Sequence, residues 1–318
     1  MKSLLAVVFA SVYGLSIRLL FGFFDNLMGI MSASFIMLVP VIIGALTVLF
    51  IPKADIKNAI HAFFMPWLTS LAILIVTMMC NIEGAICWIM IFPMFAILAG
   101  FGGVGVYFFR RYRKNNEDKP NTLNISLLLL VPTALGFAEG DRTLIPKEFI
   151  LTKEVIIAAP PAKVWQSLTN INTITPTEKR SSLSDIIGFP KHLSTSLDTL
   201  AVGGKRVAQY ENGLYFEETI SRYEPGHLMV LDIKTDPKKI PPTVLDEHIV
   251  IGGKHVDILE DQYILEQLPD GNSRLILSSK FFINTPFNWY AGIWADYLMA
   301  DILDGELKLI KNRSEKTK

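Results

Sequence analysis

Residues 152–169 read TKEVIIAAPPAKVWQSLT, and this stretch decides the fold because a very apolar half of the chain gives way here to a polar one. Val155 to Ala158 are β-branched or small and are followed by two prolines, so we expect a short strand that the prolines end. Pro161 suits the first turn of a helix, where its missing N–H donor is not needed. The helix would carry one apolar face, made of Val164, Trp165 and Leu168.

This strand, double-proline break and Val-Trp helix resemble the opening of the START-like superfamily, also called SRPBCC, which includes polyketide cyclases, lipid-transfer domains and Bet v 1-like proteins. The resemblance covers residues 149–314. It implies an α+β helix-grip domain, in which a curved antiparallel sheet wraps around a long C-terminal helix and leaves a hydrophobic cavity. Function varies widely across this superfamily, so the resemblance implies a cavity and does not name its ligand.

The composition indicates a membrane protein. The 318 residues are 51% hydrophobic with a mean hydropathy of +0.38, which is too apolar for two ordinary soluble domains. The formal net charge is zero, and no basic patch interleaved with aromatic residues follows the apolar half, so we expect no nucleic-acid partner. Two cysteines are too few for a disulfide scaffold or a cysteine-rich metal site.

Four apolar runs are each long enough to cross about 30 Å of hydrocarbon as a helix. They are approximately residues 3–24, 27–51, 60–79 and 85–109. A fifth run, 123–138, is shorter and contains Pro132, so it either crosses the membrane, re-enters it or lies at its interface. We expect a membrane bundle of four to five transmembrane helices over residues 1–140, joined by a tether at 141–148 to the domain at 149–314.

The charges between the runs predict the orientation, because short cytoplasmic loops are enriched in Lys and Arg. Lys2, Lys53 and the basic residues of 110–119 alternate with loops at 25–26 and 81–84 that contain no Lys or Arg. We therefore expect a multi-pass protein of a plasma or inner membrane, with a cytoplasmic N-terminus. We favour a fifth run that crosses, which places the C-terminal domain outside the cytoplasm; otherwise that domain is cytoplasmic.

Polar and small residues in the apolar half each have two interpretations. Arg18 either extends to the membrane interface or pairs with a partner. Cys80 and Cys87 flank a short loop and either form a disulfide or remain thiols. Small residues let helices approach closely, and the fourth run ends with Gly100, Gly102, Gly103 and Gly105.

The C-terminal half predicts a meander of antiparallel strands. A polar stretch at 170–200 comes first, with a short helix expected at 182–187. The following segments alternate at period two between turn residues, as half-buried strands do. They are 205–211, 214–223, 227–234, 262–268 and 274–283. A final helix at 286–311 carries an aromatic face, which in the START-like arrangement lies across the concave side of the sheet.

We expect the cavity to be lined from the opening helix, the strands and the final helix. The candidates for ligand binding are Trp165, Phe216, Glu218, Tyr263, Leu277, Phe281, Tyr290, Trp294 and Tyr297. The aromatic candidates also suit simple core packing. His255 and Asp257 have the spacing of a general base and its orienting carboxylate on an extended segment, but they lie among glycines and acids that read as a solvated loop.

Three functions follow from these features, and we place ligand binding first. A cavity tethered to a membrane would meet a lipid or another hydrophobic small molecule where such molecules concentrate. The alternatives are a cyclase or hydratase acting on such a molecule, and a sensory or interaction module that regulates the helical bundle. No defining catalytic motif is present and the five histidines are scattered, so we expect no metal and no cofactor, and whether a reaction is catalysed stays open.

Overall fold

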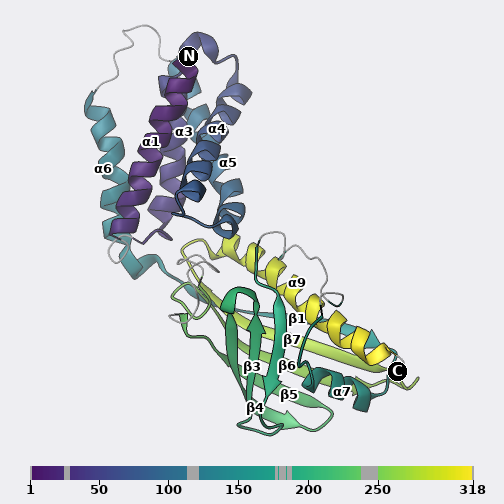
Figure 1. The fold of residues 1–318 in the computed structure, drawn as a ribbon. Helices are drawn as coiled ribbons and strands as arrows, with labels where there is room; N and C mark the ends of the chain where they lie inside the picture. The colour runs from purple at the N-terminus through teal and green to yellow at the C-terminus, as the bar shows by residue number, and fades with distance from the viewer. Residues whose placement is uncertain are drawn as a thin grey trace. The chain divides into compact units, whose positions relative to one another are not determined.

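The computed structural model describes residues 2–24, 29–112, 122–175, 178, 184, 188–237 and 250–316. The chain divides into two compact units, Met1–Leu144 and Ile145–Lys318, and the division falls within the stretch expected as a tether. The first unit is helical, whereas the second combines one antiparallel sheet with helices (Figure 1).

The helices of the first unit form where the apolar runs occur. They are α1 (Lys2–Phe23), η1 (Ser34–Leu38), α3 (Val39–Phe50), η2 (Lys53–Asp55), α4 (Ala59–Met79), α5 (Ala85–Tyr112), α6 (Thr122–Glu139) and η3 (Gly140–Thr143). η1 is a π-helical turn that leads directly into α3.

Among the described residues, three helices are long and apolar enough to cross a membrane, so the fourth and fifth expected spans are not confirmed. They are Ser3–Phe23, Ala59–Met79 and Ile86–Tyr112. The second run becomes helical only after Ser32, whose Oγ accepts a hydrogen bond from the Phe35 amide (3.3 Å). The apolar helix in this run is therefore the shorter segment Ser34–Phe50. The apolar part of α6 at Leu130–Glu139 is shorter still.

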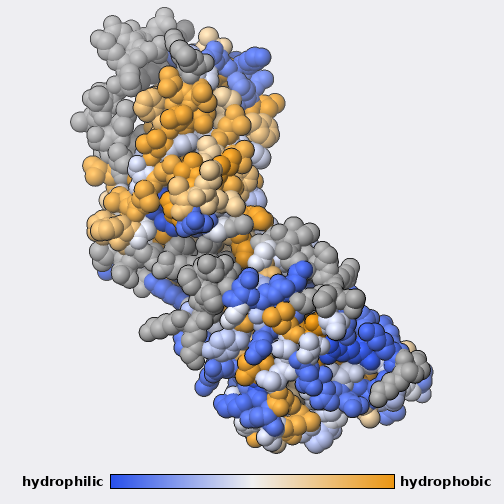
Figure 2. All heavy atoms as spheres, viewed as in Figure 1, coloured by the Kyte–Doolittle hydropathy of each residue, from blue (hydrophilic) through white to orange (hydrophobic). Residues whose placement is uncertain are grey.

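The outer faces of these helices are apolar. Only 33%, 28% and 39% of the three spanning windows is buried inside the structure, although each window is strongly hydrophobic. Figure 2 shows the resulting apolar surface over much of the visible face of the helical unit. Such a surface is unfavourable in water and suits hydrocarbon, which is consistent with a membrane protein.

Buried polar groups and close helix contacts organise the first unit. Arg18 pairs through its guanidinium Nε with Glu83, so the interpretation with a partner is the one observed. Cys80 and Cys87 are not joined by a disulfide. A Cβ built at Gly102 would lie 2.0 Å from the Val41 carbonyl oxygen, so α5 approaches α3 closely there.

The second unit contains a seven-stranded antiparallel sheet in the order β1-β7-β6-β5-β4-β3-β2. Its elements are β1 (Pro146–Ile157), α7 (Pro161–Thr169), β2 (His192–Leu197), β3 (Lys205–Tyr210), β4 (Tyr215–Glu224), β5 (Leu228–Lys234), β6 (Val256–Gln267), β7 (Ser273–Asn284) and α9 (Asn288–Glu315). This is the expected sheet with a long C-terminal helix, in a helix-grip-like arrangement (Figure 1).

Three features of the sheet differ from the expectation. The opening strand begins at Pro146 rather than at Val155, because it pairs along its whole length with β7. β2 forms inside the polar stretch that was expected to contain only a short helix, and it pairs with β3. β6 begins at Val256, so residues 256–261 are strand and not loop. The expected helix at 182–187 falls outside the described residues, apart from Ser184.

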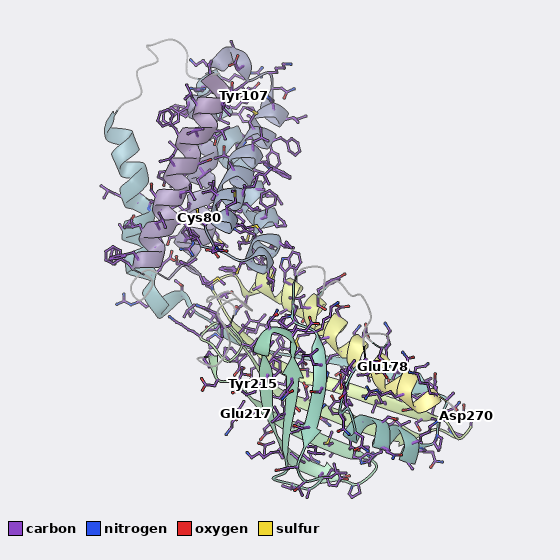
Figure 3. All side chains as sticks on the ribbon, in the orientation of Figure 1. Cys80, Tyr107, Glu178, Tyr215, Glu217 and Asp270 are labelled. Atoms are coloured by element: carbon purple, nitrogen blue, oxygen red, sulfur yellow. The ribbon has the colours of Figure 1, made fainter. Side chains whose placement is uncertain are left out.

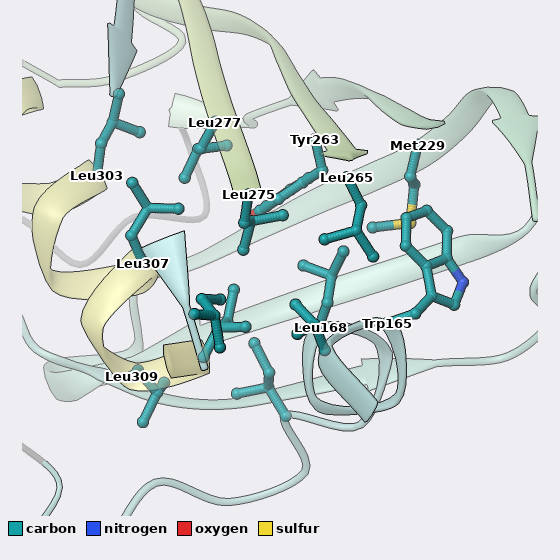
Figure 4. Close-up of a cluster of buried hydrophobic side chains, with 14 of the residues drawn as sticks. Trp165, Leu168, Met229, Tyr263, Leu265, Leu275, Leu277, Leu303, Leu307 and Leu309 are labelled. Carbon is teal, nitrogen blue, oxygen red and sulfur yellow. The ribbon is translucent and has the colours of Figure 1, made fainter. Parts of the chain in front are cut away.

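The core of the second unit lies between the sheet and the helices α7 and α9. Alternate residues of β7 are buried, as the period of a half-buried strand requires. Figure 4 shows leucines of α9 and of β7 meeting side chains of α7. The labelled residues of this core are Trp165, Leu168, Met229, Tyr263, Leu265, Leu275, Leu277, Leu303, Leu307 and Leu309.

Candidate functional site

A charged cluster lies on the inner face of the sheet, beside this apolar core. The alternation of β3 and β4 turns Arg206 and Glu218 inward, where they oppose each other in register. Arg206 Nη1 lies 2.8 Å from Glu218 Oε2, and the two side chains are only 5% and 6% exposed. The guanidinium also lies 5.8 Å from the ring centre of Tyr263 in β6. An ion pair so far from water depends on its geometry to offset desolvation.

The final helix contributes a second carboxylate to the cluster. Glu306 sits one position before Leu307 on α9, and its Oε1 lies 3.8 Å from Arg206 Nη2. Its Oε2 accepts a hydrogen bond from His192 Nδ1 at 3.3 Å. His192 in turn contacts Thr195 Oγ1 through Nε2 (2.8 Å) and stacks on Tyr210 with ring centres 4.9 Å apart. The helix is thereby joined to the β2 and β3 side of the sheet.

A third carboxylate, Asp261, lies on β6 opposite Ser279 of β7. Burial raises the pKa of Asp261 from 3.8 to about 7, while the neighbouring Ser279 hydroxyl acts in the opposite direction. Burial likewise raises the pKa of Glu218, against the effect of the Arg206 charge. Burial would raise the pKa of Glu306 too, but the hydrogen bond and charge of His192 hold it below its usual value. Burial therefore raises the pKa of Asp261 and of Glu218, whereas His192 lowers that of Glu306.

Two carboxylate oxygens of the cluster are buried without a hydrogen-bond donor in the described part of the chain. They are Glu306 Oε1 and Asp261 Oδ1. The Ser279 hydroxyl is also buried, next to Asp261. Buried acceptors normally find donors, so these atoms indicate that a water molecule or a ligand completes the cluster. Within the described residues no group of three or more His, Cys, Asp or Glu side chains is arranged to hold a metal ion.

Six of the nine predicted lining residues lie buried in the second unit. They are Trp165, Phe216, Glu218, Tyr263, Leu277 and Phe281. Tyr290 and Trp294 on α9 are half-buried, and Tyr297 is 54% exposed. The structure therefore brings Glu218 and Tyr263 together at the cluster, and it separates Tyr297 from them.

The other acid–base candidates lie apart from the cluster. His255 contacts the Asn284 carbonyl oxygen through Nδ1 (2.9 Å), and Asp257 accepts a hydrogen bond from the Ile258 amide (2.9 Å). Both sit at the far end of β6 from Tyr263. Glu217 faces away from the core, on the other side of β4 from Glu218 (Figure 3).

Arg206, Glu306 and His192 were not among the predicted site residues. A signal for two of them exists in the sequence. Arg206 alternates with Ala208 on the buried face of β3, and Glu306 falls between Leu303 and Leu307 on the buried face of α9. A charge at an apolar position of a periodic pattern indicates a buried, partnered group.

No family model matches the chain, and no curated protein matches it. Among solved structures, a protein from Nitrosospira multiformis is 14% identical with a TM-score of 0.33, over 52% of this chain and 96% of its own. A truncated norcoclaurine synthase from Thalictrum flavum is 13% identical with a TM-score of 0.32, over 55% of this chain and 97% of its own. The di-domain ARO/CYC BexL is 13% identical with a TM-score of 0.35, over 63% of each chain.

Proposed function

We propose that this chain is a membrane-anchored protein whose second unit binds a lipid or another hydrophobic small molecule. The apolar part of the ligand would lie against the leucine-rich core, and its polar group would meet Arg206, Glu218 and Glu306. The support is a charged cluster set into an apolar interior, since ions removed from water are unfavourable by several kcal/mol each unless they are fully paired. Side chains of this kind concentrate at sites that bind or react.

The observation that carries the proposal is the pair of buried acceptors, Glu306 Oε1 and Asp261 Oδ1. The pKa of Glu306 is lowered, so its Oε1 belongs to a carboxylate and the complementary ligand group donates hydrogen bonds, as a hydroxyl, amide or amine does. The carboxylates outnumber the single guanidinium of Arg206 in the cluster, which also favours a donor over an anion.

Native mass spectrometry and solvent extraction of the purified full-length protein test this function. We expect a defined apolar molecule with a hydrogen-bonding group to co-purify. Glu306→Gln keeps the size of the side chain and removes its charge, so we expect at least about tenfold lower occupancy, which corresponds to about 1.4 kcal/mol. Asp270→Asn, at the exposed tip of the β6–β7 hairpin, is the control (Figure 3). Absence of any such molecule, or equal occupancy in both variants, would overturn the proposal.

A reaction of the cyclase or hydratase type is the second candidate, and Asp261 favours it. A carboxyl group whose pKa lies at about 7 can both accept and donate a proton near neutral pH. The Tyr263 hydroxyl is on the same face of β6, two residues away. An enzyme predicts that Asp261→Asn still retains the extracted molecule but no longer converts it, whereas a carrier predicts no conversion by either form.

We infer the orientation in the membrane from contacts at the ends of the helices. Ser3 Oγ contacts Asp55, and the Arg110 guanidinium donates to the Val48 and Ile51 carbonyl oxygens, so these groups share one end of the bundle with the basic loops. Glu139, at the end of α6, accepts hydrogen bonds from Ser34, close to where α3 begins and therefore at the opposite end. These contacts support an α6 that crosses the membrane and a second unit outside the cytoplasm.

A further inference from the structure

An exposed row of large apolar side chains runs along the first turns of α9. Trp289, Ile293 and Tyr297 follow one another at intervals of four residues, so they lie on one face of the helix. They are 64%, 62% and 54% exposed. Ile145, where the second unit begins, is also 64% exposed. We name these four residues the aromatic face.

The aromatic face is not part of the core. The opposite side of α9 packs on the sheet, where a Cβ built at Gly292 would lie 3.2 Å from the Phe149 ring. Met299 continues this inner side and is packed among Phe281 and Ile283. The helix therefore packs one side on the sheet and turns a second apolar side outward. Contiguous exposed apolar groups of this size mark a surface that contacts another apolar phase.

The aromatic face lies where the chain enters the second unit, at Ile145. The Asn288 side chain accepts hydrogen bonds from the Thr285 amide (2.8 Å) and hydroxyl (2.9 Å), and its Nδ2 donates to the Ile145 carbonyl oxygen. Only η3 and Leu144 separate α6 from Ile145. A 3₁₀ turn rises about 2 Å per residue and extended chain about 3.3 Å, so Ile145 lies within about 15 Å of the end of α6.

Two exposed lysines lie at the same end of the second unit. Lys147 follows Ile145 at the start of β1. The exposed Lys254 is placed there by its carbonyl oxygen, which accepts a hydrogen bond from Asn284 Nδ2 (3.1 Å), and Asn284 pairs with Pro146. Asp296 on the flank of the face and Glu148 beside Lys147 are exposed acids, and Glu148 pairs with Lys280. Lys side chains beside Trp and Tyr are the combination that membrane interfaces with anionic lipids attract.

We propose that the aromatic face of α9 inserts into the headgroup region of the membrane in which the helical unit is embedded. The second unit would then be held at two points, the covalent link after α6 and the interfacial contact of Trp289, Ile293 and Tyr297. This inference rests on the membrane anchoring proposed above and is independent of whether the charged cluster binds a ligand.

Photo-crosslinking of the full-length protein in nanodiscs of phosphatidylcholine and phosphatidylglycerol tests it. The variant Ile293→p-benzoyl-phenylalanine places the probe in the aromatic face. The matched control, Lys308→p-benzoyl-phenylalanine, is exposed on the same helix and roughly 22 Å farther along it at 1.5 Å per residue. After illumination, mass spectrometry identifies what each probe has captured.

We expect several-fold more phospholipid adduct at position 293 than at position 308. Equal lipid capture at both positions, or no capture at 293, overturns the inference. Capture of residues 1–144 or of a second copy of the chain in place of lipid also overturns it, because the face would then be a protein interface. Ligand extraction is a separate measurement. A failed crosslink therefore does not contradict the proposed function, and an empty extract does not contradict the membrane contact.

Discussion

Arg206 is the central cation of the charged cluster, and its removal would leave buried carboxylates without a partner. We expect Arg206→Met to destabilise the second unit by about 3–5 kcal/mol, the usual loss when one member of a buried pair is removed. The double variant Arg206→Met with Glu218→Leu removes both charges and is expected to recover much of that loss. Thermal unfolding of the purified protein measures both variants. A single variant as stable as the parent would show that the pair is not desolvated.

Asp261 makes the stability of the second unit depend on pH. Its folded pKa of about 7 lies above the ordinary value of 3.8, so the folded state binds the proton more tightly and is favoured at low pH. This contribution is complete below about pH 4 and is lost as the pH rises through 7, with a span of up to about 4 kcal/mol. We expect Asp261→Asn to flatten the decline of the unfolding midpoint between pH 4 and pH 7, and the exposed Asp270→Asn to leave it unchanged. A parent protein without such a decline would contradict the burial of Asp261.

Part of the charged cluster was predictable from single residues, and part was not. Glu218 and Tyr263 were identified because they alternate with apolar neighbours in recognisable strands. Asp261 is one of the acids that the sequence predicts to lie in a solvated loop. The glycines before Val256 are typical of a loop, so the sequence does not indicate that β6 already begins at Val256. His192 lies on a strand without apolar periodicity, and only its pairing with β3 brings it to Glu306. Long-range pairing of this kind leaves no local trace in the sequence.

Among the elements, the contact between α3 and α5 depends on glycine. A Cβ at Gly102 would come within 2.0 Å of the Val41 carbonyl oxygen, whereas one at Gly105 would meet nothing within 4 Å. We expect Gly102→Ala to separate the two helices and to lower the unfolding temperature of the protein in detergent. Gly105→Ala is the matched control and should be neutral or slightly stabilising, because alanine favours the helix by about 1 kcal/mol over glycine. Equal effects of the two substitutions would mean that the close approach is absent.

The strands that carry a clear period of two were predicted, and those that depend on a distant partner were not. β3, β4, β5 and β7 lie where the alternation placed them. β1 begins nine residues before the visible apolar stretch, at Pro146 instead of Val155, because β7 pairs with the polar residues too. The second apolar run forms a shorter helix than its hydropathy predicts. Hydropathy does not indicate where a helix begins, which here follows the hydrogen bond from the Phe35 amide to Ser32 Oγ.

At the scale of the whole molecule, the orientation can be tested by labelling. In a Cys80→Ala, Cys87→Ala background, we expect a membrane-impermeant maleimide to label Asp270→Cys on intact cells, because that residue is exposed on the second unit. Lys53→Cys is exposed at the basic end of the bundle and should react only after the cells are permeabilised. The reverse pattern would place the second unit in the cytoplasm and α6 within one leaflet.

The pairing of β1 with β7 also governs when the second unit can fold. Residues 146–157 are the first of the unit to be synthesised, yet the strand beside them is residues 273–284. Ribosomes add roughly 5–20 residues per second, so β1 waits on the order of 10 seconds for its neighbour. The nascent sheet is therefore incomplete until β7 has been synthesised, and α9 follows it. Truncation anywhere before β7 would leave the earliest strand without a sheet to join.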